Sequence, residues 1–179
     1  MQENFSLAFF MSTSYNVGTK WGEVGESVIK PLKNPRKGAA AVTGEYAHTL
    51  DAKGRLAVPA RLRDELGSVF YVTLSMDRCL SAYSADNWQK FSDKVDAMPF
   101  VKQRKMRPLF AFAARCEVDA AGRILLPQNL REYAGLEKDV TVVGCNNHAE
   151  LWDSAKWAEQ HEIEMTPENI AAVMEELEF

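Results

Sequence analysis

The feature that most constrains the fold of this chain is an internal repeat, in which one ten-residue motif occurs twice. The first copy runs from Leu50 to Pro59 (LDAKGRLAVP), and the second runs from Val118 to Pro127 (VDAAGRILLP). Position 50 corresponds to position 118, and the same spacing continues into Leu62-Arg63 and Leu130-Arg131. Spaced identities at a constant offset indicate an internal duplication, so we expect two similar structural units.

Each copy predicts the same succession of secondary-structure elements. The Asp-Ala-x-Gly sequence is typical of a turn, because Asp caps its own backbone and Gly adopts positive φ. A short apolar strand follows, and the proline begins a short helix that ends at Gly67 or Gly135. Val69–Leu74 and Val140–Val143 each predict another strand. A final strand and a tryptophan-bearing helix complete each unit of about 50 residues, which is too small to bury a core alone.

The chain is expected to divide into five segments. Residues 1–41 would be a disordered or spurious extension, 42–101 the first repeat, 102–114 a connector, 115–158 the second repeat and 159–179 an acidic helical tail. The tail contains seven glutamates and no lysine or arginine, and its apolar residues recur at helical spacing. The connector mixes bases with aromatic residues, which is typical of either a nucleic-acid contact or an amphipathic segment with solvated bases.

Charge and cysteine content narrow the class of protein. The net charge is −4, but the acidic tail accounts for it, so the repeats can still carry a basic face. The three cysteines form no CxxC pair and the three histidines have no metal-ligand spacing, so we expect buried thiols and no metal. No catalytic motif is present. We therefore expect no enzyme activity, no cofactor and no small-molecule substrate. The apolar runs are too short to span a membrane, which predicts a cytoplasmic protein.

The repeated Asp-x-x-Gly-Arg-(apolar)-x-x-Pro motif resembles the bacterial MraZ family. Gly44–Asp51 is similar to the start of that family, and Glu150-Leu151-Trp152 to a later segment, so that the resemblance covers about residues 43–159. It implies an α+β, mainly β fold: a duplicated AbrB-like swapped-hairpin β-barrel with short helices and a C-terminal helix. It also implies a homo-oligomer, arranged as a ring.

The function that the resemblance implies is sequence-specific binding of double-stranded DNA. Such a regulator would bind short G-rich direct repeats and control the cell-division and cell-wall gene cluster, including its own gene, from a nucleoid-associated position. The alternative is an antitoxin-like module that neutralises a partner protein through its acidic tail.

The same resemblance carries a DNA-contacting role onto Lys53, which lies in the first turn, and onto Arg55, which directly follows it. The candidate DNA-contacting residues are Lys53, Arg55, Arg61, Arg63 and Arg123. In the second copy Ala121 replaces Lys53 and Asn129 replaces Arg61. The first copy is therefore expected to make the principal contacts with DNA.

A structural role is the alternative for the two motif arginines. Arg55 could form a buried ion pair with Asp51, and Arg123 could do the same with Asp119. Arginine suits both roles, because its guanidinium group binds carboxylates, phosphates and the edge of guanine through two parallel hydrogen bonds.

Residues 1–41 do not match the family pattern, and reverse translation gives them another interpretation. Lys20-Trp21-Gly22 and Val24-Gly25 can encode G-rich words whose starts lie about ten nucleotides apart, one turn of B-DNA. Arg36-Lys37-Gly38 can encode a ribosome-binding sequence shortly before Val42. The hypothesis is that the natural protein starts at Val42 and that residues 1–41 are the translated operator.

Overall fold

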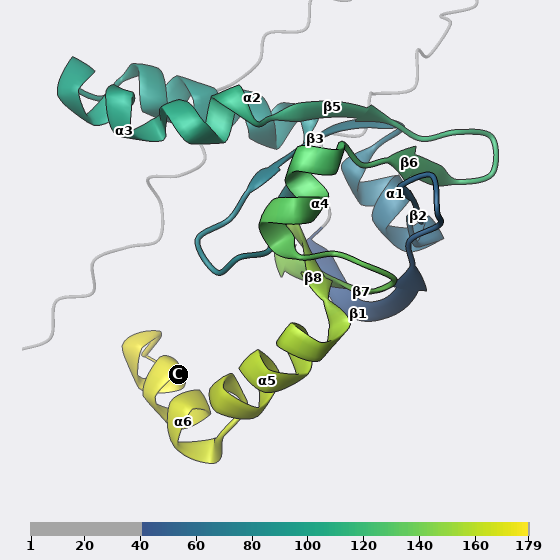
Figure 1. Ribbon diagram of the computed structural model, residues 1–179. Coiled ribbons are helices and arrows are strands. Elements are labelled where there is room, and N and C mark those ends of the chain that lie inside the picture. Colours follow the sequence, from purple (N-terminus) through teal and green to yellow (C-terminus); the bar gives the residue numbers. More distant parts are fainter. Residues whose placement is uncertain (1–40, 179) are drawn as a thin grey trace, which may run out of the picture. The chain divides into compact units, whose positions relative to one another are not determined.

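The computed structural model describes residues 41–178, and Figure 1 shows how its elements are arranged. The expectations for the segment 1–41 lie outside the described residues, apart from its last position. The first half contains β1 (Val42–Thr49), β2 (Arg55–Ala57), α1 (Ala60–Leu66), β3 (Val69–Leu74), β4 (Leu80–Ser84) and α2 (Ala85–Asp96). After α3 (Phe100–Ala111), the second half contains β5 (Ala114–Glu117), β6 (Arg123–Leu125), α4 (Gln128–Ala134), β7 (Asp139–Asn146), β8 (Ala149–Asp153) and α5 (Ser154–Glu164). The last helix is α6 (Pro167–Glu176). The two halves repeat the same element order, which confirms the predicted succession.

The two halves exchange their first strands. The main sheet has the order β1-β7-β8-β4-β3-β5, and all of its pairings are antiparallel. Strand β1 of the first half thus pairs with β7 of the second, and β5 of the second half pairs with β3 of the first. Strands β1 and β5 are the edges of this sheet and do not pair with each other, so the sheet within residues 41–178 is open and forms no closed barrel.

The short strands β2 and β6 form a separate two-stranded ribbon at the junction of the halves. Two reciprocal backbone hydrogen bonds extend it: Val58 N–H donates to the Gly122 carbonyl, and Leu126 N–H donates to the Gly54 carbonyl, both at 2.9 Å. Each turn is therefore bonded to the strand end of the other half. Neither half forms this ribbon without its partner, which explains why the halves pack as one unit.

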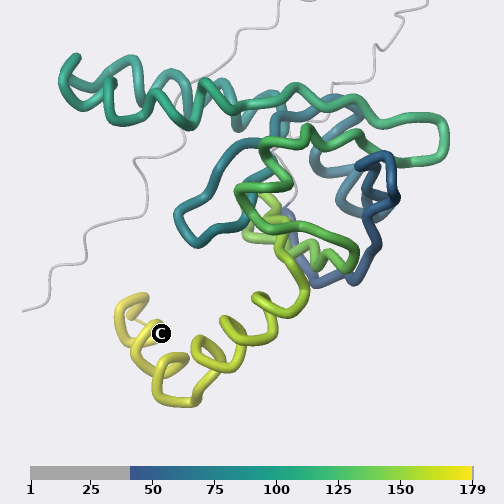
Figure 2. The backbone as a smooth tube through the Cα atoms, viewed as in Figure 1, coloured from purple at the N-terminus to yellow at the C-terminus, as the bar shows by residue number. Residues whose placement is uncertain are grey.

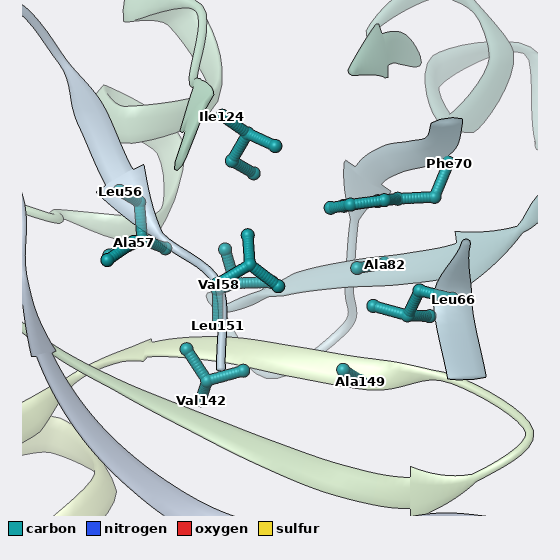
Figure 3. Close-up of a pocket in the computed structure, with 10 residues that line it drawn as sticks. All are labelled: Leu56, Ala57, Val58, Leu66, Phe70, Ala82, Ile124, Val142, Ala149 and Leu151. Atoms are coloured by element: carbon teal, nitrogen blue, oxygen red, sulfur yellow. The ribbon is translucent and has the colours of Figure 1, made fainter. Parts of the chain in front are cut away.

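Both halves contribute to a single apolar core. Leu56 and Ile124 lie opposite each other in the ribbon, and each is only 1% exposed. Figure 3 shows them facing Phe70, Val142 and other residues around a small apolar cavity. The cavity has a volume of about 10 Å³, which is scarcely enough for one water molecule. This gap is a packing feature and has no room for a ligand.

The connector between the repeats is largely helix α3, which lies beside α2. Figure 2 traces the chain through these two helices into β5. The Phe110 ring packs on Trp88 and Phe91, with ring centroids 5.4 and 5.7 Å apart. The Thr73 hydroxyl donates a hydrogen bond to the Leu109 carbonyl. The connector bases are all exposed: Lys102, Arg104, Lys105 and Arg107. One side of the connector is thus docked while its bases are solvated.

The predicted acidic tail is divided between two helices: its first residues complete α5, the tryptophan-bearing helix expected for the second unit, and most of the rest forms α6. Helix α5 ends at Glu164, and Thr166 then caps α6 by accepting a hydrogen bond from Asn169 N–H at 3.2 Å. Pro167 occupies the first turn of α6, where it fits, but it cannot continue a preceding helix. With these helices, helical residues outnumber strand residues. The fold is α+β, and the description "mainly β" applies only to its core.

None of the helices among residues 41–178 combines the length and the apolar character that crossing a bilayer requires.

Candidate nucleic-acid interface

The carboxylate of Asp51 organises the first turn. Its Oδ1 atom accepts hydrogen bonds from the backbone N–H groups of Lys53 and Arg55, each at 2.9 Å, and its Oδ2 atom accepts from Arg55 Nε at 2.7 Å. Gly54 completes the turn with a φ of 78°. Hydrogen bonds from Arg55, first of all from its backbone N–H, lower the pKa of Asp51 to about 2. The carboxylate is therefore ionised, and the turn is held, at neutral pH.

The second turn repeats this arrangement around Asp119. Its Oδ1 atom accepts from the N–H groups of Ala121 and Arg123 at 2.9 Å, and its Oδ2 atom accepts from Arg123 Nε at 3.0 Å and Nη2 at 2.8 Å. The hydrogen bond between the side chains lowers the pKa of Asp119 and raises the pKa of Arg123. The matching geometry shows that both copies of the repeat encode the same aspartate-anchored turn as well as the same order of elements.

Both motif arginines form the ion pairs that were considered as the alternative, but the pairs are not buried. The side chains of Arg55 and Arg123 are 33% and 34% exposed, and those of their aspartate partners are 35% and 39% exposed. The expectation of buried pairs is corrected on this point, because the turns lie at the ends of a surface ribbon. An exposed ion pair orients an arginine without removing it from solvent.

The β2–β6 ribbon has an inner face and an outer face. Leu56 and Ile124 point into the core, so their neighbours along each strand point outward, because side chains alternate in a strand. Arg55 is opposite Leu125, and Arg123 is opposite Ala57, which places the two arginines diagonally. Leu125 is 62% exposed, as expected for an outward-facing residue. We call the outer face the arginine ribbon; it consists of Arg55, Ala57, Arg123 and Leu125.

The two arginines differ in the nitrogen atoms that remain available. Arg55 gives only Nε to its aspartate, and no hydrogen bond within residues 41–178 engages its two terminal nitrogens. Arg123 gives both Nε and Nη2. Arg55 can therefore still bind a ligand through two parallel hydrogen bonds, whereas Arg123 retains one terminal nitrogen.

The other predicted basic residues of the first repeat surround the ribbon in different ways. Lys53 lies at the tip of the first turn and is exposed. Arg61, on α1, has a side chain that is 67% exposed, but it is partly anchored. Its Nη2 atom donates to Thr43 Oγ1 at 3.3 Å, and its Nε atom lies 3.7 Å from Glu65 Oε1. Of these two cations, only Arg61 has hydrogen-bond and ion-pair partners for its side chain among residues 41–178, so Lys53 is the more available to a ligand.

Arg63 has a position that the sequence did not indicate. It is half-buried against the second turn, where a methyl group at Gly122 would lie 2.9 Å from Arg63 Nη1. Its Nε atom is buried and has no hydrogen-bond partner within residues 41–178. Its role as a direct DNA contact stays a prediction, and its geometry is that of a support for the turn.

Arg131 occupies the corresponding position in the other half and was not among the predicted site residues. It packs on Gly54, where an added methyl group would lie 3.0 Å from its guanidinium, and its Nε atom donates to the Leu126 carbonyl at 3.1 Å. The match of Arg63 with Arg131 in the repeat was the available signal. A residue type kept in both copies, on the helix after each turn, indicates that each helix supports the turn of the opposite half.

These features define a class of protein: a tandem-repeat α+β protein whose halves exchange strands and present two aspartate-anchored arginines on one surface ribbon. Residues 41–107 and 109–176 each match the sequence profile of the family described as "MraZ protein, putative antitoxin-like". The chain therefore belongs to the MraZ family, with one profile match for each repeat. The predicted membership and the predicted duplication are both confirmed.

Curated relatives named transcriptional regulator MraZ agree with this assignment, and three of them serve as examples. The protein of Acetivibrio thermocellus is 47% identical over 135 residues, which cover 73% of this chain and 94% of that protein. The protein of Desulfitobacterium hafniense strain Y51 is 48% identical over 119 residues, covering 65% and 83% respectively. The protein of Clostridium beijerinckii is 44% identical over 137 residues, covering 75% and 96%.

Proposed function

We propose that this chain is a DNA-binding transcriptional regulator that reads double-stranded DNA with its arginine ribbon. The names of its relatives support a regulator of transcription. The observation that carries the proposal is the hydrogen bonding of the Arg55 side chain. Asp51 fixes its Nε atom at 2.7 Å while its two terminal nitrogens stay available at the surface.

This geometry suits the recognition of a base. A two-stranded β-ribbon fits the major groove of B-DNA, and a guanidinium group recognises guanine through O6 and N7. Because Asp51 orients Arg55 before DNA binds, less side-chain entropy is lost on binding. The carboxylate also offsets part of the arginine charge, so this contact depends more on direction than on net attraction. Lys53, exposed and without such a partner, is suited to a phosphate.

The second half would bind DNA more weakly. Arg123 has already committed two nitrogens to Asp119, and Ala121 stands where the first turn has Lys53. We infer that the first half is the principal reader and that the second half contributes a weaker, supporting contact. Arg61 can add a phosphate contact beside the first turn, because its side chain remains largely exposed.

The proposal includes self-assembly into a ring-shaped homo-oligomer of AbrB-like units, in which the two halves of each chain exchange strands. The exchange of β1 and β5 between halves supports the AbrB-like arrangement, because each half completes the sheet of the other. Helix α6 and its C-cap residue carry apolar side chains that are 44–60% exposed among the described residues: Ile170, Val173, Met174 and Leu177. Contiguous exposed apolar surface is typical of an interaction site. When several subunits of one oligomer bind neighbouring DNA repeats together, avidity would raise the affinity roughly 10²–10⁴-fold.

The proposed targets are short G-rich direct repeats ahead of the gene for this protein, which would begin a cell-division and cell-wall gene cluster. The protein would then be cytoplasmic and nucleoid-associated. A test is to titrate the full chain onto a labelled duplex containing such repeats and onto a scrambled duplex of equal composition. Fluorescence anisotropy at fixed salt should show clearly tighter binding to the repeats.

A second candidate function is an antitoxin-like protein-binding module, which the family description and the exposed apolar side of α6 favour. The two candidates differ in the titration above. Equal, weak binding to both duplexes would contradict the regulator and favour the protein-binding module. Light scattering on the same sample gives the mass; a value near 20.1 kDa at micromolar concentration would contradict the oligomer.

A further inference from the structure

The hairpin between β7 and β8 brings together three side chains of the types that bind transition metals. The Cys145 thiol, the His148 imidazole and the Glu150 carboxylate each offer one atom, and these atoms all lie within 4.8 Å of one another. The hairpin pairs Val143 with Glu150, and Cys145 N–H donates to the His148 carbonyl at 2.9 Å. Because side chains alternate along each strand, all three groups project from the same face of the hairpin.

We propose that Cys145, His148 and Glu150 bind a Zn²⁺ ion. Thiolate, imidazole and carboxylate are the three protein ligand types that zinc accepts, and a site with three of them leaves a fourth position for water or another ligand. The sequence predicted no metal, because its cysteines form no CxxC pair and its histidines lack metal-ligand spacing. The tight turn of the hairpin brings together ligands that the sequence pattern did not suggest.

The distance between His148 and Glu150 fits a tetrahedral ion. His148 Nε2 lies 3.3 Å from Glu150 Oε1. Two ligands at about 2.0–2.1 Å from a tetrahedral zinc ion are separated by about 3.3 Å, so this pair already has the required spacing. The side chains of His148 and Glu150 are 20% and 18% exposed, which leaves a path for the ion to enter.

Neighbouring groups orient each of these two ligands. Asn147 Oδ1 lies 2.8 Å from His148 Nδ1, and the Tyr83 ring stacks on the imidazole with centroids 5.1 Å apart. Trp152 Nε1 donates to Glu150 Oε2 at 2.9 Å, which leaves Oε1 directed at the histidine. Fixed outer partners of this kind are a regular feature of metal sites in proteins.

A bound ion would join the end of β7 to the start of β8. Strand β7 also holds the exchanged strand β1, with Thr43 opposite Cys145. Zinc would therefore stabilise the hairpin on which the strand exchange depends. This consequence is separate from DNA reading, because none of the three ligands belongs to the arginine ribbon.

The test is a Zn²⁺ titration of the full chain, purified without a histidine tag, in competition with a chelating dye. Residues 1–40 contain no histidine or cysteine, so they add no thiol or imidazole ligand. We expect one equivalent of zinc to bind and to raise the melting temperature. Substitution of Co²⁺ should give a thiolate-to-metal charge-transfer band in the near ultraviolet.

Variants separate this site from adventitious binding. Cys145→Ser, His148→Ala and Glu150→Gln should each weaken Zn²⁺ binding at least about tenfold, and Asn147→Ala, which keeps all three ligands, should also weaken it about tenfold. The matched controls are Cys116→Ala and His48→Gln, which remove a thiol and an imidazole elsewhere and should leave binding unchanged. Circular dichroism confirms that each variant is folded. The proposal is overturned if no single equivalent binds, or if the ligand variants bind as tightly as the controls.

Discussion

A leucine-to-alanine substitution should lower the free energy of unfolding much more on the inner face of the β2–β6 ribbon than on its outer face. Leu56→Ala removes three carbon atoms from a side chain that is 1% exposed and borders the small core cavity shown in Figure 3. At about 0.8 kcal/mol for each buried carbon, the lost transfer free energy is about 2.4 kcal/mol. The enlarged cavity adds to this, so we expect a loss of about 3–4 kcal/mol in the free energy of unfolding.

Leu125→Ala is the matched control, because it makes the same chemical change on the outer face of the same ribbon. Leu125 is already 62% exposed, so its truncation should cost less than about 0.5 kcal/mol. Urea denaturation of both variants at one fixed protein concentration measures the difference, with similar slopes expected. Equal losses for the two variants, or a loss below about 1 kcal/mol for Leu56→Ala, would refute the assignment of inner and outer faces.

Three further predictions concern the first turn and the residues that precede β1. Lys53→Ala should weaken binding to repeat-containing and scrambled duplexes alike and should lower the salt dependence by about one phosphate contact, measured by anisotropy at several salt concentrations. Gly54→Ala should lower the melting temperature, because the φ of 78° costs other residues about 1–2 kcal/mol and the added methyl group meets Arg131; an unchanged melt would contradict the turn geometry. A chain that begins at Val42, the first residue of β1, should melt and bind DNA like the full chain, and N-terminal sequencing of the native protein that found Met1 would contradict the proposed start.

The succession of elements was predictable because its signals are local. The turn at Gly54 and the strand and helix that follow it depend on neighbouring residues, and the second copy repeats the signals. The break before α6 was predictable in principle, since Thr166 followed by Pro167 is a helix-start signal. The apolar spacing of the tail continues across this break, so spacing alone does not indicate it.

The candidate site was only partly predictable, for a different physical reason. That Asp51 and Arg55 could pair was evident from their spacing, but how many nitrogens each arginine keeps free depends on side-chain conformation. The support of each turn by Arg63 or Arg131 depends on contacts between halves that are distant in sequence. The grouping of Cys145 with Glu150 requires the exact register of a hairpin, which residue types alone do not determine.

The central claim is that Arg55 on the arginine ribbon reads DNA, and one measurement tests it most directly. The dissociation constants of the native chain and of Arg55→Ala are compared on the repeat-containing and the scrambled duplex, with thermal melts of both proteins. We expect Arg55→Ala to melt normally, to lose about 1–3 kcal/mol of binding free energy on the repeats for each engaged reader, and to change little on the scrambled duplex. Full affinity for the repeats together with a normal melt would contradict the claim.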